Sequence, residues 1–394
     1  MGLVHKTYQH RAYANAAGYD RLDFVMLNCA RLYNAALEEW RAAYKHSRIS
    51  RTLYDQMKEL TGVRHDDPEF WGAISIQVGR GVLVRLERAR QSFFRRVRDG
   101  ETPGFPRFKS SARWNTIEIA EPSRAMVKQV GDRHAIKIKG LPTIRLRKGL
   151  ELPDTGSLKA LTITRRGRRL FVNLTYAVER ESLPSSGAVV GIDMGVSDRM
   201  TLSTGEALRR RRKPNGKLRQ SQQRLSRCRK GSRRWKQRRA TLANHQYRER
   251  VRNRNECHRV TTELVRRFGL IAVEDLPIRN MTASARGTVE EPGRYVKQKA
   301  GLNRSVTEQT WGIMRNQLTY KAEWAGRELV AVDPKFTSQR CSGCGAVSAE
   351  HRQGKRYKCA ECGMTKDADV NAALNILHKA LTGGDFPVAV PDAA

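Results

Sequence analysis

Residues 189–195 have the sequence Val-Val-Gly-Ile-Asp-Met-Gly, a short apolar run that ends on an acidic residue. Such a run is typical of a buried strand in a parallel or mixed sheet. A second run, Leu-Ile-Ala-Val-Glu-Asp-Leu at 270–276, reaches its first acid at Glu274. Asp193 and Glu274 therefore fall at the ends of two predicted strands, where an ionised carboxylate is costly unless a cation neutralises it.

A third acid begins a predicted helix near the carboxyl end of the chain. Residues 369–376 have the sequence Asp-Val-Asn-Ala-Ala-Leu-Asn-Ile, which places Asp369, Ala372, Ala373 and Ile376 on one helical face. The small residues on this face would let the helix approach a sheet closely. We therefore expect Asp369 to join the acids at the two strand ends.

The three acids together predict a metal site, although each taken singly is more often a surface residue. Oxygen ligands suit the hard cations Mg²⁺ and Mn²⁺. Two such ions ~4 Å apart favour in-line hydrolysis of a phosphodiester. Gly191 and Gly195 are expected to let the backbone and a phosphate come close, and residues 201–203 to return as the second strand of a hairpin. This is the expected beginning of an RNase H-like nuclease fold.

Four cysteines form a second motif. Cys341 and Cys344 are separated by two residues, as are Cys359 and Cys362, with 14 residues between the pairs. This spacing, although one residue short of the usual range, predicts a closed tetrahedral Zn²⁺ site. The alternatives are disulfides or a redox pair, but no secretion signal and no thioredoxin-like βαβ pattern supports them. The glycine after each pair is expected to allow a tight turn that points backbone amides at the sulfurs.

The charge of the chain indicates a polyanionic partner. Lys and Arg number 75 against 39 Asp and Glu, which gives a formal net charge of +36. Residues 209–259 contain 21 Lys or Arg and two acids, and are predicted to form a basic helical pair. Because a merely solvated face normally mixes both signs, we expect this segment to bind nucleic acid. The candidate contacts are Arg209, Arg210, Arg211, Arg212, Arg233, Arg234, Trp235, Lys236, Arg238 and Arg239.

The remaining sequence predicts a multidomain α+β protein. A strand, a helical block and several further strands suggest an N-terminal β-barrel with a helical insertion. A capping box at 305–308 is expected to begin a helix that carries Trp311, Met314, Leu318 and Ala322 on one face. No apolar run is long enough to span a bilayer, and no signal peptide follows Met1. The expectation is a cytoplasmic protein without a membrane partner, associated with the nucleoid when bound to DNA.

The order of these motifs resembles TnpB, the RNA-guided endonuclease of bacterial and archaeal insertion sequences, and the compact type V CRISPR effectors. The resemblance covers most of the chain and is sharpest from residue 191 to residue 377. It rests on the Gly-Ile-Asp-x-Gly and Val-Glu-Asp-Leu motifs, on residues 337–345, on the second cysteine pair and on residues 369–376. Before Gly191, the best match is residues 104–109.

The resemblance implies a domain order and a mechanism. The implied ranges are 1–16 for the first strand of a wedge barrel, 17–100 for a helical recognition lobe, 101–182 for the rest of the barrel, 187–336 for a RuvC nuclease domain, 337–366 for a zinc ribbon that loads the target strand, 367–382 for the last RuvC helix and 383–394 for a disordered tail. It also implies that Asp193, Glu274 and Asp369 are catalytic. A guide RNA would supply most of the specificity for double-stranded target DNA next to a short adjacent motif, and one site would cut both strands.

Two alternatives belong to other classes. A guide-independent RuvC-type transposase or resolvase would not require the N-terminal half of the chain or its excess of basic residues. An RNA-guided repressor without cleavage would be expected to lack one of the acids, and all three are present. The sequence leaves open whether the chain is encoded by a transposon or is a compact CRISPR effector.

Overall fold

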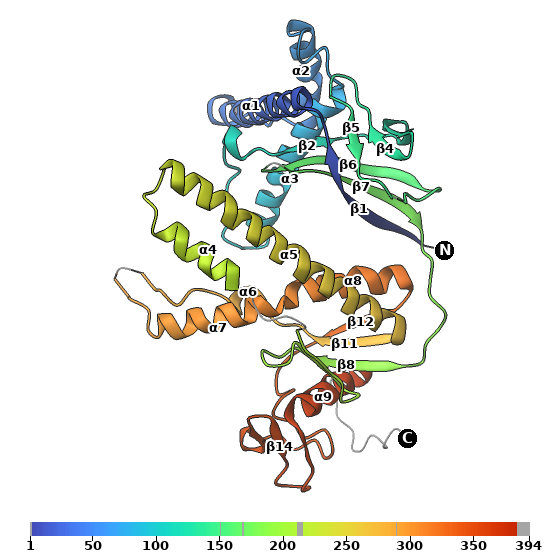
Figure 1. The fold of residues 1–394 in the computed structure, drawn as a ribbon, viewed down its shortest axis with the longest axis vertical. Coiled ribbons are helices and arrows are strands. Elements are labelled where there is room, and N and C mark those ends of the chain that lie inside the picture. The colour runs from blue at the N-terminus through green and yellow to red at the C-terminus, as the bar shows by residue number, and fades with distance from the viewer. Residues whose placement is uncertain (1, 150, 168, 211–215, 289, 384–394) are drawn as a thin grey trace. The chain divides into compact units, whose positions relative to one another are not determined.

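The structure is a computed structural model that describes residues 2–149, 151–167, 169–210, 216–288 and 290–383. The chain divides into two compact units, Met1–Glu179 and Arg180–Ala394 (Figure 1). Apart from Gly383, the tail expected to be disordered lies outside the described residues, as do Arg211 and Arg212. None of the described helices is both long enough and apolar enough to cross a membrane.

The first unit contains a sheet that, in the described residues, has seven strands in the order β2-β6-β7-β1-β5-β4-β3. Their bounds are β1 (Leu3–Tyr13), β2 (Thr116–Ile119), β3 (Val127–Val130), β4 (Arg133–Ile136), β5 (Ile144–Leu146), β6 (Ser157–Arg166) and β7 (Arg169–Glu179). All neighbours are antiparallel, and β1 pairs with β7 along most of its length. The β6–β7 hairpin lies where the sequence predicts it.

The predicted closed barrel is wrong, because the sheet has two edges among the described residues, β2 and β3. Closure would need these two edge strands to exchange hydrogen bonds. Instead, β2 packs against helices, and β3 is a four-residue strand whose side chains are mostly exposed. A short, exposed edge and a helix-covered edge are two ways to leave a sheet open without inviting further strand pairing.

Three helices follow β1 and pack on one another: α1 (Ala16–Ser47), α2 (Leu53–Asp66) and α3 (Ile76–Arg98). Capping residues explain where α1 and α2 begin, and an apolar face explains the packing of α3. Asn15 caps α1, Thr52 and Asp55 form a capping box at α2, and α3 has a buried apolar stripe through Val78, Val82 and Leu86.

The second unit is built on a sheet that, in the described part of the chain, has five strands in the order β10-β9-β8-β11-β12. Their bounds are β8 (Val189–Asp193), β9 (Met200–Leu202), β10 (Ala207–Leu208), β11 (Leu270–Glu274) and β12 (Glu328–Val332). The strands β8, β11 and β12 are parallel, whereas β9 and β10 return antiparallel. The predicted hairpin at residues 201–203 is therefore confirmed as β8–β9, one residue earlier.

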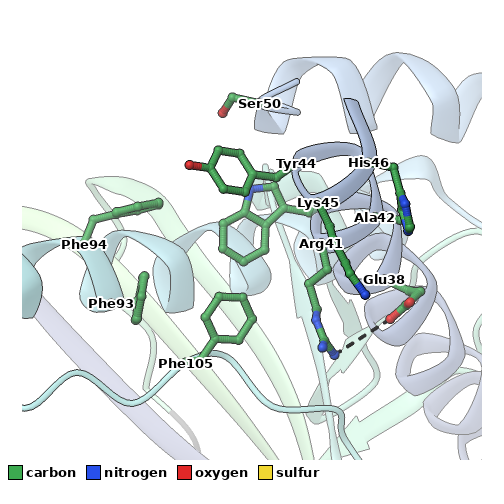
Figure 2. Close-up of a pocket in the computed structure, with 11 residues that line it drawn as sticks. Glu38, Arg41, Ala42, Tyr44, Lys45, His46, Ser50, Phe93, Phe94 and Phe105 are labelled. Carbon is green, nitrogen blue, oxygen red and sulfur yellow. Dashed lines mark ion pairs between the residues drawn. The ribbon is translucent and has the colours of Figure 1, made fainter. Parts of the chain in front are cut away.

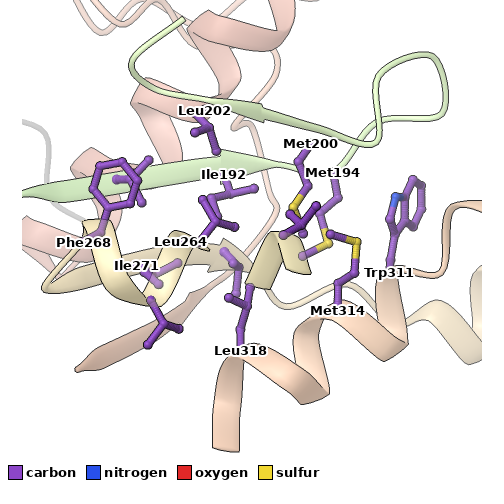
Figure 3. Close-up of a cluster of buried hydrophobic side chains, with 14 of the residues drawn as sticks. Ile192, Met194, Met200, Leu202, Leu264, Phe268, Ile271, Trp311, Met314 and Leu318 are labelled. Carbon is purple, nitrogen blue, oxygen red and sulfur yellow. The ribbon is translucent and has the colours of Figure 1, made fainter. Parts of the chain in front are cut away.

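Helices cover both faces of this sheet. The helices described in this unit are α4 (Gly216–Ser226), α5 (Arg233–Arg267), α6 (Ile278–Met281), α7 (Val296–Gln309), α8 (Trp311–Ala325) and α9 (Ala368–Thr382), and α4 packs on α5. On one face, Ile192 and Ile271 pack in a core with residues of α5 and α8 (Figure 3). On the other face, Ala272 packs against Ile376 of α9. Because side chains alternate along a strand, Asp193 and Glu274 project toward the α9 side.

The capping-box prediction at 305–308 is wrong. Ser305 lies inside α7, where its hydroxyl donates to the carbonyl of Gly301. The helix that carries Trp311 and Met314 is α8, and it begins after Thr310, which has a φ of 61°. The four-residue pattern matched, but a buried Val306 holds this stretch as the end of the preceding helix.

A small domain with a three-stranded sheet, among the described residues, separates β12 from α9. Its strands are β13 (Arg352–Gln353), β14 (Arg356–Lys358) and β15 (Thr365–Asp367), and it contains the four cysteines. A short 3-10 turn, Ala349–His351, precedes these strands, and two others in the first unit are Ser111–Arg113 and Arg124–Met126.

Candidate functional site

Two parallel strands bring Asp193 and Glu274 to the same edge of the second unit's sheet. β8 and β11 are neighbours, with Val273 opposite Ile192, so the next residue of each strand is the acid. Both strands are largely buried, because helices cover both faces of the sheet. Their apolar sequences are typical of central strands covered in this way. The carboxyl ends of two adjacent strands thus carry one carboxylate each.

The helix α9 brings the third acid to this edge. Asp369 is in its first turn, and the cap is Asp367, whose carboxylate accepts from the backbone N–H groups of Asp369 and Val370. A Cβ on Gly191 would lie only 2.0 Å from the carbonyl oxygen of Ala373. Glycine is therefore required at this position because α9 passes directly over β8.

The three carboxylates lie at the same edge of the sheet, close enough for Glu274 and Asp369 to affect the charge of Asp193, but their oxygens do not form a group within 4.8 Å as the cysteine sulfurs do. Burial, together with the neighbouring carboxylates of Glu274 and Asp369, raises the pKa of Asp193 to about 7. Burial also raises the pKa of Glu274, while a hydrogen bond from the Thr337 hydroxyl opposes this rise. That hydrogen bond measures 2.6 Å, and Thr337 itself is buried. The site therefore concentrates negative charge that it neutralises only in part.

Cations from the cysteine-bearing domain supply that partial neutralisation. The Arg352 guanidinium donates to Asp369 at 2.8 Å, and the Lys355 ammonium lies 3.7 Å from the same carboxylate. Lys355 also pairs with buried Asp198, which accepts from Arg209 at 2.7 Å. Sequence analysis missed Arg352, Lys355, Thr337 and Asp198. Only Thr337 lay inside a motif that could have signalled its role.

The four cysteines come together as their spacing predicts. The sulfurs of Cys341, Cys344, Cys359 and Cys362 all lie within 4.8 Å of one another, and they are the only such group of three or more metal-binding side chains among the described residues. The pairs mirror each other: Gly345 and Gly363 both have positive φ, of 81° and 74°. The predicted tight turns are thus confirmed.

The cysteine cluster fits Zn²⁺ by the chemistry of its donors. Four sulfurs at this separation match a closed tetrahedral structural site. Burial raises the pKa of the Cys341 thiol, so four thiolates would not coexist there without a cation. Backbone N–H groups from Gly343 and Met364 point at sulfurs of the cluster, as in sites that hold charged sulfur.

The asparagines of α9 join the cysteine-bearing domain to the helix that carries Asp369. Asn371 donates to the carbonyl of Arg340 at 2.7 Å and accepts from the N–H of Ser342 at 2.9 Å. Asn375 donates to the carbonyls of Thr337 and Arg340. Both asparagines are fully buried. The motif at 369–376 therefore serves two sites, one through its acid and the other through its amides.

The basic segment is less uniform than its sequence. Arg233, Arg234, Lys236 and Arg239 are exposed on α5, with the Arg239 guanidinium 5.3 Å from the centre of the Trp235 ring, and Arg238 is half-buried. Arg209 is exposed but pairs with Asp198. Arg210 is mostly buried, and its guanidinium donates to Glu249 and Asn253. Nucleic-acid contact by these residues stays a prediction, and Arg210 has an evident structural role.

The fold and the two clusters define an α+β protein built like the Cas12 effectors. One solved structure, described as the cryo-EM structure of a Cas12f1-sgRNA-target DNA complex, matches 95% of this chain and 98% of its own with a TM-score of 0.59 at 14% identity. Two family models match parts of the sequence. The model described as "Probable transposase" covers residues 173–285, and the one described as "Cas12f1-like, TNB domain" covers residues 311–376.

Relatives in sequence identify the family. A protein of Escherichia coli K12, named "Putative RNA-guided DNA endonuclease InsQ", is 37% identical over 77% of this chain and 75% of its own. A "Putative RNA-guided DNA endonuclease" of Streptomyces pristinaespiralis is 29% identical over 97% of this chain and 90% of its own. The chain belongs to the TnpB family of RNA-guided DNA endonucleases.

Proposed function

We propose that this chain binds a guide RNA and hydrolyses double-stranded DNA, next to a short adjacent motif, at one site formed by Asp193, Glu274 and Asp369. The observation that carries the proposal is the meeting of these three buried or half-buried carboxylates at one edge of the sheet. Its strand order, with an antiparallel hairpin followed by parallel strands, is the one expected for a RuvC-type, RNase H-like domain. Membership in the family supports the RNA and DNA partners.

The carboxylates would hold Mg²⁺ or Mn²⁺, because they are oxygen donors, and burial together with mutual repulsion raises the pKa of Asp193. The chemistry that such ions would supply is activation of the attacking water and stabilisation of the leaving oxygen of a phosphodiester. The rest of the chemistry belongs to the chain. The Thr337 hydroxyl holds Glu274 in one orientation. Arg352, beside Asp369, offers a guanidinium to a phosphate oxygen.

The remaining parts receive roles by position and charge. The unit Met1–Glu179 would be the wedge and recognition lobes, and the cysteine-bearing domain would be the zinc ribbon that loads the target strand. The long match to InsQ favours the transposon-encoded TnpB, since the match to a Cas12f1 of Sulfoacidibacillus thermotolerans spans only 75 residues. We place the protein in the cytoplasm, on the nucleoid when it is bound to DNA.

The test is a programmed cleavage assay with the full chain. RNA that copurifies at moderate salt should be sequenced, its guide segment replaced, and a plasmid library with randomised flanking sequence offered in the presence of Mg²⁺. We expect cutting only beside the new target and one short motif. A chain that carries no RNA and binds none from its own locus would refute guidance. Cutting that ignores the guide would favour the resolvase alternative.

A further inference from the structure

A hollow lined by aromatic rings lies in the first unit and contains none of the acids, cysteines or basic residues discussed above. It has a volume of about 530 Å³ and lies among the carboxyl ends of α1 and α3 and the loop after α3. Tyr44, Phe94 and Phe105 line it and are 56%, 55% and 43% exposed. Figure 2 shows these rings arranged around one space, with Phe93 between Phe94 and Phe105. Three large exposed rings around one hollow are unusual on a surface that binds nothing.

The walls of the hollow are fixed in place. Trp40, at its base, is buried, and its ring stacks on Phe105 with centroids 5.2 Å apart and planes 13° from parallel. The loop that carries Phe105 is held by Asn34, whose side-chain amide donates to the carbonyl of Lys109 at 3.0 Å and accepts from its N–H at 2.8 Å. The rings are therefore presented on a rigid support, which lowers the entropy cost of binding.

Cations surround the aromatic hollow. The cationic side chains Arg41 and Lys45 line it, together with His46 and a single acid, Glu38. The Arg41 guanidinium lies 5.8 Å from the centre of the Phe105 ring, and its ion pair with Glu38 is a long 3.9 Å between exposed side chains. Such an exposed pair contributes little and leaves the guanidinium available to a ligand.

A second hollow adjoins the first and has the chemistry of a phosphate site. It is lined by Arg88, Arg95 and Arg98, and it shares Phe94 with the aromatic hollow. No acid lines it. Arg95 has no ion pair within the described part of the chain, and Arg98 pairs only with its exposed neighbour Asp99, at 3.6 Å. A guanidinium group with no protein partner of its own is well suited to a phosphate oxygen.

A flat π-system beside an anionic group is the chemistry of one nucleotide. We propose that the aromatic hollow stacks an unpaired base of the bound RNA, while Arg95 and Arg98 hold its phosphate. Bases in a DNA duplex are stacked on each other, whereas loops and bulges of a structured RNA present bases that aromatic rings can receive. A second copy of this chain is disfavoured as the occupant because both hollows are cationic. The inference rests on the proposed function, because that function supplies the RNA.

The test uses the full chain and the RNA that copurifies with it, extracted and end-labelled. Tyr44→Ala and Phe105→Ala should weaken its binding by roughly tenfold each, the range found when one stacked base is lost. Tyr44→Phe should retain the affinity. In chemical probing, the same few bases should become reactive in both alanine variants. Tyr54→Ala is the matched control, because Tyr54 is 78% exposed in the same unit but lies outside the hollow.

The second hollow is tested by salt dependence. Arg95→Ala should lower the slope of log K against log salt by about 0.7, the value for one phosphate contact on a single strand, whereas Tyr44→Ala should leave the slope unchanged. Arg96→Ala, on the same helix but outside the hollow, should change neither the footprint nor the affinity by as much as Arg95→Ala. Circular dichroism should show the same fold in all variants, since each truncated side chain is exposed or half-buried.

Three results would overturn the inference. The first is that the hollow variants and the control variants have the same affinity for the RNA and the same footprint. The hollow variants could alter the protection of target DNA and leave that of RNA unchanged. They could instead change the mass of the chain in solution, which would show that a second copy covers the hollow. If the wild-type chain binds no RNA, the proposed function itself fails, and this outcome is distinct from the other three.

Discussion

The cysteine cluster and the carboxylate site differ in how closely the folded chain brings their metal-binding atoms together. The four sulfurs already lie within 4.8 Å of one another, held by two tight turns of a small domain. No such grouping of acids exists among the described residues, and Arg352 and Lys355 pair with Asp369 instead. Two local turns are enough to bring four sulfurs together in a structural metal site. The carboxylate site instead depends on three elements that are distant in the sequence, and its buried negative charge requires nearby cations.

The acid site nevertheless depends on the cysteine-bearing domain through α9. Asn371 and Asn375 fasten the cysteine-bearing domain to the helix that carries Asp369, and the cations that neutralise Asp369 come from that domain. Loss of the cysteine site should therefore disturb the acid site, while loss of an acid should leave the cysteine site intact. The predictions below test this asymmetry.

The largest effect should come from the cysteine cluster. Cys341→Ser or Cys359→Ser should release zinc and unfold the small domain, because metal binding there supplies on the order of 10 kcal/mol of its folding free energy. Elemental analysis should find one zinc per wild-type chain and none in these variants, and hydrogen exchange should accelerate across residues 337–366. Cys228→Ser, outside the cluster, is the control. Zinc retained in full by both cluster variants would contradict the assignment.

Loss of any of the three acids should abolish cutting and leave binding unchanged. Asp193→Ala, Glu274→Ala and Asp369→Ala each remove a ligand worth several kcal/mol in the transition state, a loss on the order of a thousandfold or more. Cleavage and RNA-guided target binding should be measured side by side with zinc content, which should remain at the wild-type level. Asp275→Ala is the matched control, since Asp275 is exposed and pairs with Arg315. Equal cutting by all variants would place the active site elsewhere.

The pH dependence of metal binding should distinguish the acid site from the cysteine site. The pKa of Asp193 is raised to about 7, so below that pH its folded carboxyl holds a proton that the unfolded chain has lost above about pH 4. The metal-free protein should therefore lose stability, by a few kcal/mol at most, as pH rises through this window. Mg²⁺ should raise the melting temperature more at pH 8 than at pH 6, and Asp193→Asn should remove the difference. A pH-independent Mg²⁺ effect would argue against Asp193 as a ligand.

The smallest effect should come from Asp367, two residues before the third acid. Its carboxylate caps α9, so Asp367→Ala should cost about 1 kcal/mol of stability and reduce cutting by less than tenfold. Asp367→Ser, which can still cap the helix, should restore most of the stability in thermal melts. If Asp367→Ala is inactive while Asp369→Ala still cuts, the third acid has been assigned to the wrong residue.

Sequence analysis succeeded where a feature is set by neighbouring residues. The strands that end on Asp193 and Glu274, the two cysteine turns and the helix beginning near Asp369 all follow from patterns a few residues long. It failed where distant contacts decide. The box at 305–308 is a good local signal, yet burial of Val306 keeps that stretch within α7. The barrel prediction was wrong because the sequence of an edge strand does not specify whether it pairs with the strand at the opposite edge.

The sequence by itself predicted the chemistry of both sites, because donor type and spacing are local properties: sulfur pairs suit a soft cation and carboxylates at strand ends suit a hard one. It also determined the polyanionic partner through net charge. Only the tertiary structure decided which cations neutralise Asp369, why Gly191 must be glycine, and that Tyr44, Phe94 and Phe105 share one hollow. Those relations join residues far apart in the chain, and packing alone brings them into contact.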